Sequence, residues 1–425
     1  MKTVTVVGLG YVGLPLACLC AEKGHKVYGF DVDKSKVDSV NKNESPIEDE
    51  HVGNRLKNVK IYATTNPEDC IPNSDIVIVC VPTPVDRNNS PDLTAVMNAA
   101  LTVSKFIRQG ALLVVESTIY PGTIEEVVLP ILQKEKFNAQ KNDLLVAHCP
   151  ERIDPGNRKW TIEMLPRVVG GVTKEAAKAA AEFYRGILNA EVLELSSVKA
   201  AEATKIMENT FRDINIAFVN EMAQSFDKAG IDIIEVVKGA STKPFAFMPH
   251  YPGSGVGGHC IAQDPYYMIE RGRQLGFNHE FLKLARKINN NMPHYTVELL
   301  ENELKKLKKS VKGAKVGVLG LAYKGNVDDT RESPSFEVIN ILKTKGADVF
   351  VFDSHVKAGS NVKDLDELLN KSDYIVLVTD HKEFKQMDLE KLKKHKILVV
   401  IDGRNCLDKE KIKSMGILYH GIGRS

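Results

Sequence analysis

The sequence lacks any hydrophobic run long enough to span a membrane. Its apolar runs, such as Ile76–Val81, have the length of a strand and fall far below the ~20 residues that a membrane-spanning helix needs. The first residues, Met1–Val7, enter a strand pattern directly, without the basic, apolar and small-residue regions of a signal peptide. The sequence therefore predicts a protein that does not cross a membrane and carries no cleaved leader.

The sequence also lacks a marked excess of charge and any regular spacing of cysteines. The formal net charge of the 425 residues is only +2, which gives no reason to expect nucleic acid or a membrane surface as a partner. Without metal-site or disulfide spacing, we expect no metal and a reduced, cytoplasmic protein. The seven cysteines are Cys18, Cys20, Cys70, Cys80, Cys149, Cys260 and Cys406.

The length predicts two or three domains, and the first begins with a glycine-rich turn. Residues 4–7 predict a buried strand and residues 14–23 a helix, with Gly8-Leu-Gly-Tyr-Val-Gly13 between them. Gly8 permits a tight turn, Gly10 lets a pyrophosphate approach, and Gly13 lets the helix pack on the strand. The phosphates would lie against the N–H groups at the start of the helix. The pattern predicts a dinucleotide site.

An acid follows the second expected strand of this domain. Residues 26–30 lead into Asp31, about twenty residues after the glycines, where a dinucleotide site has an acid. A carboxylate here accepts hydrogen bonds from the ribose hydroxyls and repels a 2′-phosphate. The predicted cofactor is therefore NAD rather than NADP.

Three more strands are expected over residues 75–81, 111–115 and 143–147. The loops that follow them carry Thr83, Thr118 and Glu151, and such loops hold the ligands of an open parallel sheet. These three side chains are therefore candidates for contacts with the cofactor and the reacting group. The alternative is that they belong to ordinary turns, in which threonine and proline are common.

The middle of the chain predicts a long helix over residues 198–229, which contain neither proline nor glycine. A helix of this length joins domains or forms a dimer seam. Lys205, Asn209 and Arg212 stand at i, i+4 and i+7 and share one face. This face suits an anionic oxygen or a phosphate, with a solvated polar face as the alternative. A second helix is expected over residues 280–309.

Between these helices, residues 253–265 combine four glycines with Cys260 and Asp264. This many glycines let the backbone approach a ligand closely and adopt positive φ, which suits the presentation of a nucleophile. The alternative is a turn around a buried, inert thiol, because cysteine is among the most buried residue types.

The chain after residue 310 repeats the pattern of its beginning. Residues 315–324 are expected to begin a strand-turn-helix, and further strands are expected over residues 347–353, 373–378 and 397–402. The complete GxGxxG pattern is absent, and Lys324, Arg331 and Arg404 stand near strand ends. Such cations suit a nucleotide diphosphate. The predicted fold is α/β, with Rossmann-like doubly wound domains over residues 1–197 and 311–425 and a long helical connector domain over residues 198–310 that carries the Cys260 loop.

Five motifs together resemble those of the UDP-glucose/GDP-mannose dehydrogenases. They follow the order of that family nearly from end to end: Gly8–Gly13, Val81–Pro84, Ser117–Thr123, Gly257–Ile261 with Asp264, and Gly320–Lys324 with Arg331–Pro334. The resemblance implies an NAD-dependent enzyme that oxidises C6 of a nucleotide sugar from primary alcohol to carboxylate with two NAD⁺ per turnover. It also implies a homodimer or a higher homo-oligomer.

The resemblance implies a role for each matching residue. Cys260 would capture the intermediate aldehyde as a thiohemiacetal, which is oxidised to a thioester and hydrolysed. Lys205 and Asn209 would stabilise the oxyanions, and Asp264, Thr118 and Glu151 would hold or activate the hydrolytic water. The implied NAD site comprises Gly8, Gly10, Tyr11, Val12, Gly13, Asp31, Thr83, Thr118 and Arg331. The implied UDP-sugar site comprises Arg152, Ile153, Lys205, Asn209, Arg212, Gly257, Tyr323, Lys324 and Arg404.

Several positions resemble the branch of the family that acts on UDP-N-acetylhexosamines. Pro155 stands where UDP-glucose enzymes have a second acid, and Gln263 stands where they have a lysine. Residues 151–157 and 243–245 look closer to UDP-N-acetylglucosamine enzymes. Arg212 and residues 261–262 also occur in N-acetylmannosamine enzymes, so both sugars are candidates.

Three other functions were weighed against this interpretation. UDP-glucose 6-dehydrogenase is the alternative within the family. A non-catalytic sensor of NAD and a nucleotide sugar would be expected to lose Cys260 or Lys205, and both are present. A two-electron dehydrogenase of 2-hydroxy acids needs neither Cys260 nor a second nucleotide-binding domain. The leading interpretation is a UDP-N-acetylhexosamine 6-dehydrogenase.

Overall fold

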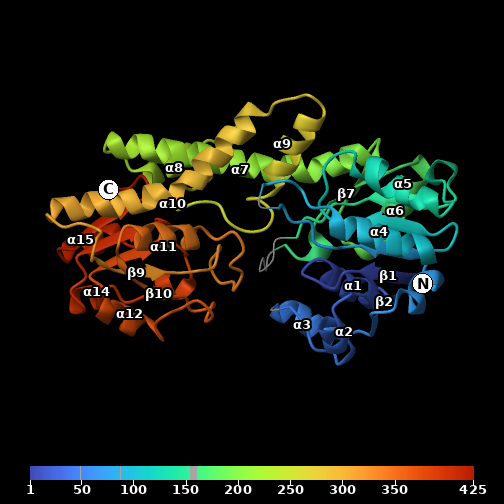
Figure 1. Cartoon of the computed structure of the whole chain (residues 1–425), viewed down its shortest axis with the longest axis horizontal. Coiled ribbons are helices and arrows are strands. Elements are labelled where there is room, and N and C mark those ends of the chain that lie inside the picture. The colour runs from blue at the N-terminus through green and yellow to red at the C-terminus, as the bar shows by residue number, and fades with distance from the viewer. Residues whose placement is uncertain (48, 87, 154–159) are drawn as a thin grey trace. The chain divides into compact units, whose positions relative to one another are not determined.

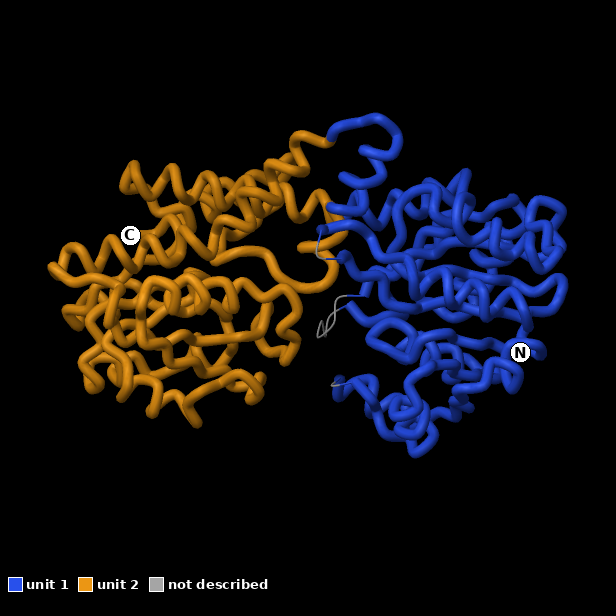
Figure 2. The backbone as a smooth tube through the Cα atoms, viewed as in Figure 1, with its two compact units in different colours: residues 1–208, 266–278 blue, residues 209–265, 279–425 orange. Residues whose placement is uncertain are grey.

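The computed structural model describes residues 1–47, 49–86, 88–153 and 160–425. The chain forms two compact units (Figure 1 and Figure 2). Unit 1 comprises residues 1–208 and 266–278, and unit 2 comprises residues 209–265 and 279–425. Of the three boundaries between the units, two fall inside the helices α7 (Val198–Lys228) and α9 (Asp264–Gln274), and the third falls between residues 278 and 279, after α9. The three domain limits expected from the sequence stay a prediction.

Unit 1 is built on an eight-stranded sheet in the order β3-β2-β1-β4-β5-β6-β7-β8. Neighbouring strands are parallel except β6 and β7, which pair antiparallel. The order β3-β2-β1-β4-β5-β6 is that of a dinucleotide-binding sheet, whose ligand crevice lies where the order reverses, between β1 and β4. The strands are β1 (Thr3–Val7), β2 (Lys26–Phe30), β3 (Ile61–Thr64), β4 (Ile76–Val79), β5 (Leu112–Val115), β6 (Leu145–His148), β7 (Arg167–Gly171) and β8 (Val192–Glu194).

The apolar strands of unit 1 are buried on both faces. In β4, Ile76 and Ile78 belong to one hydrophobic cluster, and Val77 and Val79 belong to another. Successive side chains of a strand point to opposite faces, so continuous apolar runs are what a sheet covered on both sides requires. The helices of unit 1, besides parts of α7 and α9, are α1 (Gly13–Glu22), α2 (Lys34–Asn41), α3 (Glu50–Leu56), α4 (Thr94–Phe106), α5 (Leu129–Lys134) and α6 (Lys174–Ile187).

Unit 2 contains a five-stranded, fully parallel sheet in the order β10-β9-β11-β12-β13. This is a second doubly wound order, with its switch point between β9 and β11. The strands are β9 (Lys315–Leu319), β10 (Asp348–Phe352), β11 (Tyr374–Leu377), β12 (Val399–Asp402) and β13 (Leu418–Gly421). The helices that lie wholly in unit 2 are α8 (Ile233–Ala240), α10 (Glu280–Lys306), α11 (Pro334–Thr344), α12 (Leu365–Lys371), α13 (Lys382–Lys385), α14 (Glu390–Lys394) and α15 (Lys409–Ser414).

Helix starts follow from local sequence. Asp33, Asp49 and Thr173 accept hydrogen bonds from N–H groups in the first turns of α2, α3 and α6, which satisfies donors that the helix leaves open. Ser333 caps α11 in the same way, with Pro334 at the first helical position, where its missing N–H is no loss.

The long helices α7 and α10 pack together through buried polar side chains in unit 2. Asp213 of α7 accepts hydrogen bonds from Arg286 (2.6 Å) and from the side-chain amide of Asn289 (2.8 Å), both on α10. Asn220 donates to the side-chain oxygen of Asn289 at 2.9 Å and accepts from the backbone N–H of Gly253 at 3.0 Å. This network ties the start of the Cys260 loop to the two helices.

The predicted fold class is confirmed, because two doubly wound sheets and a central helical region are present. The two long helices predicted from the sequence end within three residues of their expected positions. Strands β3, β7, β8 and β13 were not predicted. In β7 the signal is weak, because Arg167 opens a short strand that ends in two glycines.

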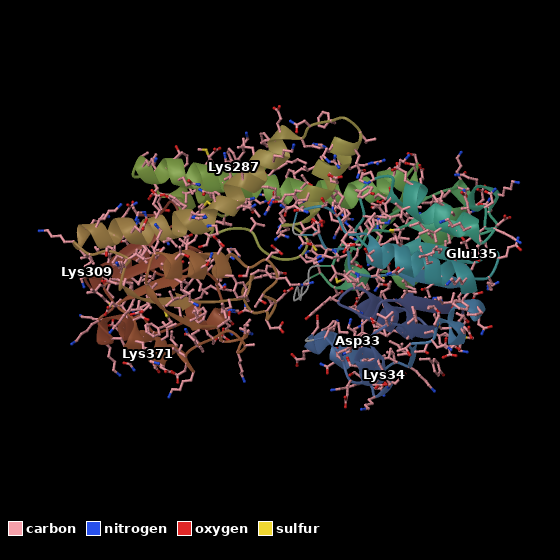
Figure 3. The ribbon with its side chains drawn as sticks, viewed as in Figure 1. Asp33, Lys34, Glu135, Lys287, Lys309 and Lys371 are labelled. Atoms are coloured by element: carbon pink, nitrogen blue, oxygen red, sulfur yellow. The ribbon has the colours of Figure 1, made fainter. Side chains whose placement is uncertain are left out.

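Charged side chains project from the surface of both units, as the labelled residues in Figure 3 show. No helix among the described residues is both long and apolar enough to cross a membrane.

Candidate active site

The glycine turn of unit 1 has the geometry that a dinucleotide needs. Gly8 has φ +98°, and a Cβ there would lie 2.6 Å from the Cys80 carbonyl oxygen. At Gly13 a Cβ would lie 1.9 Å from the Gly8 oxygen, whereas at Gly10 it would meet no atom within 4 Å. Packing therefore demands glycine at positions 8 and 13, and the backbone at Gly10 is open to a ligand. Tyr11 is exposed and Val12 is half-buried directly before α1.

Asp31 is held against this turn. One carboxylate oxygen accepts the Leu9 N–H at 2.8 Å, and the other accepts the Asp33 N–H at 2.9 Å. The ammonium of Lys36 lies 3.8 Å away. The carboxylate and the glycine turn are therefore oriented together, as recognition of ribose and pyrophosphate requires.

The corresponding acid of unit 2, Asp353, is buried and hydrogen-bonded to neighbouring groups of unit 2. One of its carboxylate oxygens accepts hydrogen bonds from the N–H groups of Leu321 (2.6 Å) and Ala322 (3.0 Å) and from His381 Nε2 (2.9 Å). Burial alone would raise its pKa, but these bonds outweigh burial and hold the pKa well below its usual range. Both acids are buried, Asp353 at 2% and Asp31 at 7% exposure, so the bond to His381 is the feature that distinguishes Asp353.

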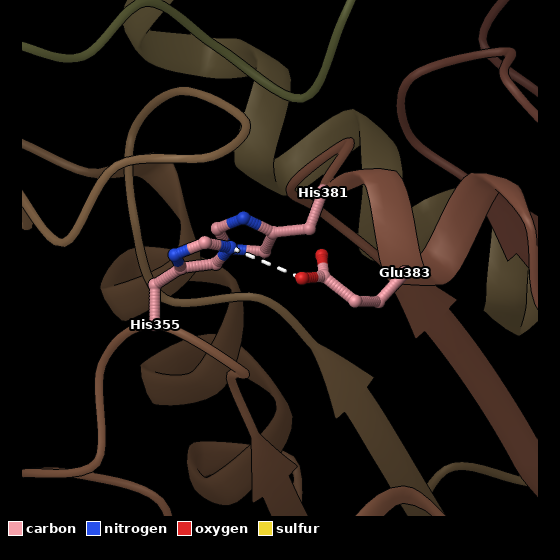
Figure 4. A group of neighbouring side chains, drawn as sticks. All are labelled: His355, His381 and Glu383. Carbon is pink, nitrogen blue, oxygen red and sulfur yellow. Dashed lines mark ion pairs between the residues drawn. The ribbon is translucent and has the colours of Figure 1, made fainter. Parts of the chain in front are cut away.

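His381 also belongs to a group with His355 and Glu383 (Figure 4). The two imidazole rings are stacked with centroids 4.5 Å apart, and His355 Nε2 lies 3.5 Å from Glu383. Both nitrogens of His381 are engaged, because Nδ1 accepts the Asn326 N–H at 2.9 Å and Nε2 bonds Asp353. A metal ion would have to break one of these bonds, so the group functions as part of the network that holds Asp353.

The loops that follow the strands of unit 1 are hydrogen-bonded to α7, which precedes Cys260 in the sequence, and to α9, which follows it. The Thr83 carbonyl accepts a hydrogen bond from the buried Tyr267 hydroxyl at 2.8 Å. Thr118 is half-buried in a loop whose Gly122 and Ile124 N–H groups donate to Glu202 of α7 at 2.6 and 2.8 Å. Burial raises the pKa of Glu202 to about 7 although these N–H bonds favour the charged form.

Lys205 lies one helical turn after Glu202 and is buried. Its ammonium donates to the backbone carbonyl of Glu151 at 2.5 Å. Lys205 and Glu151, two candidates from the sequence, thus lie together, and the contact is made by the backbone of Glu151 and not by its side chain.

The carboxylate of Glu151 faces the interior of unit 1. One oxygen accepts the N–H groups of Arg152 (2.6 Å) and Ile153, and the other accepts from Arg167 at 2.7 Å. Arg152 pairs with Glu208 of α7 at 2.6 Å. Pro155, which replaces the second acid of UDP-glucose enzymes, lies outside the described residues.

Sequence reasoning identified Glu151 as a candidate but missed Arg167, Glu116 and Tyr184, which lie around it. Arg167 lies between the carboxylates of Glu116 and Glu151, and the Tyr184 hydroxyl bonds Glu116. These side chains come from β7, the loops after β5 and β6, and α6, so no local spacing connects them. The one signal was a lone arginine at the head of an apolar strand.

The candidate nucleophile of unit 2, Cys260, is accessible to solvent. Cys260 is exposed, whereas five of the other six cysteines are buried, and the alternative of a buried, inert thiol is therefore excluded. Its backbone carbonyl accepts the Asp264 N–H at 2.8 Å at the start of α9. Asp264 is buried and accepts a hydrogen bond from the Asn209 side chain. The structure thus brings together Asn209 and Asp264, which the sequence placed 55 positions apart.

The glycines before Cys260 are required by close packing inside unit 2. A Cβ at Gly257 would lie 2.6 Å from the Glu332 carbonyl oxygen and 2.8 Å from the Tyr323 Cβ. Gly258 has φ +85° and donates its N–H to the Arg331 carbonyl at 3.0 Å. The predicted nucleotide-binding segment around Tyr323 and the nucleophile loop are therefore in direct contact.

Cations surround this contact. Arg331 pairs with Asp329 at 2.6 Å, and this carboxylate raises the pKa of Arg331. Arg404 donates to the carbonyls of Val378 (2.8 Å) and Tyr323 (3.0 Å) at the switch point of the second sheet. Lys324 is half-buried beside Tyr323, and Arg212 is exposed on α7.

Comparisons with known proteins agree along the whole chain. It matches the NAD binding domain (residues 2–188), the central domain (199–291) and the UDP binding domain (317–409) of the UDP-glucose/GDP-mannose dehydrogenase family. Protein CapL of Staphylococcus aureus is 38% identical, with 98% of this chain and 95% of the relative covered. UDP-N-acetyl-D-glucosamine 6-dehydrogenase of Pseudomonas aeruginosa is 35% identical, with 96% and 98% covered. The solved structure of UDP-D-ManNAc dehydrogenase from Pyrococcus horikoshii has a TM-score of 0.93 at 35% identity and covers 99% of each chain.

Proposed function

Because the chain belongs to the UDP-glucose/GDP-mannose dehydrogenase family, we propose that it oxidises C6 of a UDP-N-acetylhexosamine from the alcohol to the carboxylate with NAD. The single observation that carries the proposal is the exposed Cys260 thiol on a glycine loop packed against the UDP binding domain. A four-electron oxidation needs a nucleophile that holds the aldehyde between two hydride transfers, and Cys260 supplies it.

NAD, when bound at the glycine turn and Asp31, accepts one hydride in each oxidation. The alcohol loses a proton and a hydride to give the aldehyde, to which the Cys260 thiolate adds. The resulting thiohemiacetal loses a second hydride and becomes a thioester. Water then attacks the carbonyl carbon, the C–S bond breaks, and the acid and the thiol are released.

The proposed roles of the polar residues follow their contacts. Lys205 stabilises the alkoxide and the tetrahedral oxyanions, because its ammonium is held by the Glu151 carbonyl. Asn209 donates to Asp264, and Asp264 begins the helix that directly follows the thiol. We assign the orientation of the hydrolytic water to Asp264 with Thr118, since both carboxylate oxygens of Glu151 already have partners. NAD contacts from Tyr11, Val12, Thr83 and Arg331 belong to the proposal, as do UDP-sugar contacts from Arg152, Ile153, Arg212, Gly257, Tyr323, Lys324 and Arg404.

The amino sugar rather than glucose is supported by the relatives. UDP-N-acetyl-D-mannosamine dehydrogenase of Pyrococcus horikoshii is 36% identical over 99% of this chain, and the N-acetylglucosamine enzyme is nearly as similar. The N-acetyl group is common to both names, so it defines the proposed substrate class.

We further propose that the protein acts as a homodimer or a higher homo-oligomer in the cytoplasm. Helix α7 exposes Met207 (70%), Phe211 (45%) and Phe218 (57%). The spacing of these residues by four and seven places them on one face. A row of exposed apolar side chains is typical of a surface covered by another subunit.

The test is the amount of NADH formed per sugar consumed, with UDP-N-acetylglucosamine, UDP-N-acetylmannosamine, UDP-N-acetylgalactosamine and UDP-glucose offered separately. We expect two NADH per molecule of one N-acetylated sugar, and much slower turnover of UDP-glucose. One NADH would indicate a simple alcohol dehydrogenase, and none with any sugar would indicate a sensor. Preference for UDP-glucose would overturn the proposed substrate class.

A further inference from the structure

Arg167 is a fully buried cation whose environment is built from unit 1 alone. Its guanidinium donates to the Glu151 carboxylate at 2.7 Å and to the Pro150 carbonyl at 3.2 Å, and it lies 3.5 Å from Glu116. A buried guanidinium without partners would be strongly destabilising. Both hydrogen bonds fall on the same short segment, Pro150-Glu151.

A continuous set of contacts leads from Arg167 to Lys205. The Glu151 oxygen that does not touch Arg167 accepts the backbone N–H groups of Arg152 and Ile153. This folds the segment back on its own side chain and leaves the Glu151 carbonyl for a different partner. That carbonyl receives the Lys205 ammonium at 2.5 Å. The position of the ammonium therefore depends on a carboxylate that faces away from it.

The segment is held to the same helix at a second point. Arg152 pairs with Glu208, three residues after Lys205 on α7, and also donates to the Pro166 carbonyl at 2.8 Å, directly before Arg167. The loop after β6, the start of β7 and the first turns of α7 thus form one connected structure, with Arg167 at its buried end.

We propose that Arg167 is a positioning residue of the oxidation, which acts through Glu151 to hold the ammonium of Lys205 in place. The inference rests on the proposed function, in which Lys205 stabilises the oxyanions. A lysine side chain has several rotatable bonds, and ordering it costs rotamer entropy. With one N–H fixed on the Glu151 carbonyl, the ammonium is ordered before the substrate binds, which is the preorganisation that electrostatic stabilisation requires.

The same geometry argues against Glu151 as the base that activates water. Its side chain is only 7% exposed, and both oxygens accept hydrogen bonds from within unit 1. Burial raises the pKa of Glu116, and Glu151 is the carboxylate that accepts a hydrogen bond from Arg167 directly. Glu151 is therefore the direct partner of a buried cation, and neither of its carboxylate oxygens lacks a hydrogen bond.

Three variants separate these roles. Glu151→Gln keeps the shape of the side chain but turns one acceptor facing Arg167 into a donor. Arg167→Lys keeps the charge but loses the planar guanidinium, whose two terminal nitrogens bond Pro150 and Glu151 at the same time. Tyr184→Phe is the matched control, because it removes a hydroxyl that bonds Glu116 in the same buried cluster. The wild type is assayed first for two NADH per sugar, which tests the proposed function separately.

We expect Glu151→Gln and Arg167→Lys to lower kcat by roughly 100-fold, the size of effect caused by a small misplacement of a catalytic group. The KM values for NAD and the sugar should stay within about threefold, since neither side chain touches a ligand. Rapid mixing should show no burst of NADH, because the oxidation steps themselves are slowed. Tyr184→Phe should keep kcat within about threefold even if its melting temperature falls.

Three results would overturn the inference. If Glu151→Gln releases a full burst of NADH and then stalls, the carboxylate acts directly on hydrolysis of the thioester. If Arg167→Lys turns over at the wild-type rate, Arg167 serves only the fold. If Tyr184→Phe loses as much activity as the other two, the losses reflect general damage to the cluster. Should Arg167→Lys fail to fold, the kinetics of Glu151→Gln decide alone.

Discussion

At the scale of single residues, side chains of the same type differ in their environment, as two aspartates and three cysteines show. Asp31 and Asp353 both follow the second strand of a doubly wound sheet, but only Asp353 receives a histidine. Cys260 is exposed, whereas Cys80 and Cys149 are buried, and burial raises the pKa of both buried thiols. A thiol must ionise to act as a nucleophile, so the environment rather than the residue type singles out Cys260.

Replacement of Cys260 by serine should abolish acid formation while NAD binding stays intact. The hydroxyl is a far weaker nucleophile than a thiolate, so the aldehyde is not captured. The measurement is the amount of uronic acid formed, together with NAD affinity by titration calorimetry. The matched control is Cys406→Ser, a half-buried cysteine of the same unit, which should turn over normally. Normal acid formation by Cys260→Ser would contradict the thiol mechanism.

Replacement of Asp31 by alanine should weaken NAD binding by about 1–3 kcal/mol, the value of hydrogen bonds to a charged group. The variant loses the acceptor for the ribose and leaves the Leu9 N–H without its carboxylate. Asp33→Ala is the control, because this exposed neighbour caps α2 through Ser35. Calorimetric titration of NAD measures both variants. Unchanged affinity in Asp31→Ala would remove Asp31 from the ribose site.

At the scale of elements, three segments of unit 2 meet at one histidine. His420 of β13 bonds Asp227 of α7 and Glu303 of α10, both at 2.8 Å. Burial alone would lower its pKa, but the two carboxylates raise the pKa to about 9. Charged His420 therefore links both long helices to the edge strand of the second sheet.

This link makes stability depend on pH in a defined direction. The folded pKa lies above the unfolded value near 6.5, so the stabilisation is complete below pH ~6.5 and is lost as pH rises through about 9. At about 1.36 kcal/mol per unit, the loss is on the order of 3 kcal/mol. Urea unfolding followed by circular dichroism should give wild type a higher free energy of unfolding than His420→Gln at pH 6. Near pH 10 the two free energies should be equal.

A matched control for this prediction is His294→Gln, an exposed histidine on α10 whose ring lies 3.8 Å from Glu337. Its unfolding should differ little from wild type at either pH, since an exposed pair contributes little. A gap between wild type and His420→Gln that persists near pH 10 would show that packing of the ring, and not its charge, stabilises the contact.

At the scale of the whole molecule, α7 takes part in both compact units and exposes apolar side chains along its length. Its polar contacts reach the Thr118 loop through Glu202, the Glu151 loop through Lys205 and α10 through Asp213. The remaining face, with Met207, Phe211 and Phe218, is the one we assign to assembly.

Phe218→Asp should therefore shift the protein from dimer to monomer, because a carboxylate cannot be buried in an apolar contact without a large cost. Light scattering coupled to gel filtration measures the mass. Phe336→Asp is the control, since Phe336 is similarly exposed (48%) but lies on α11, and it should leave the mass unchanged. A dimer that survives Phe218→Asp would place the subunit contact elsewhere.

The sequence by itself determined what local patterns can encode. Alternating and continuous apolar runs predicted the central strands of both sheets, and the absence of proline and glycine predicted α7. Glycine spacing with a following acid predicted the NAD turn. Helical spacing indicated Lys205 and Asn209, the glycine-rich segment indicated Cys260, and the family resemblance implied the role of each. Each of these signals lies within a few residues or within one strand-turn-helix unit, where backbone geometry and side-chain period act directly.

Only the tertiary structure decided what lies between such segments. The burial of Arg167 with Glu116 and Glu151, the closure of Asp353 by His381, and the bond from Tyr267 to Thr83 join residues 16 to 184 positions apart. The tertiary structure also showed that the Glu151 carbonyl contacts Lys205, whereas the Glu151 carboxylate contacts the buried Arg167. A sequence pattern gives residue types and their period, but which of two polar groups on one residue faces a neighbour depends on the packing of elements from distant parts of the chain.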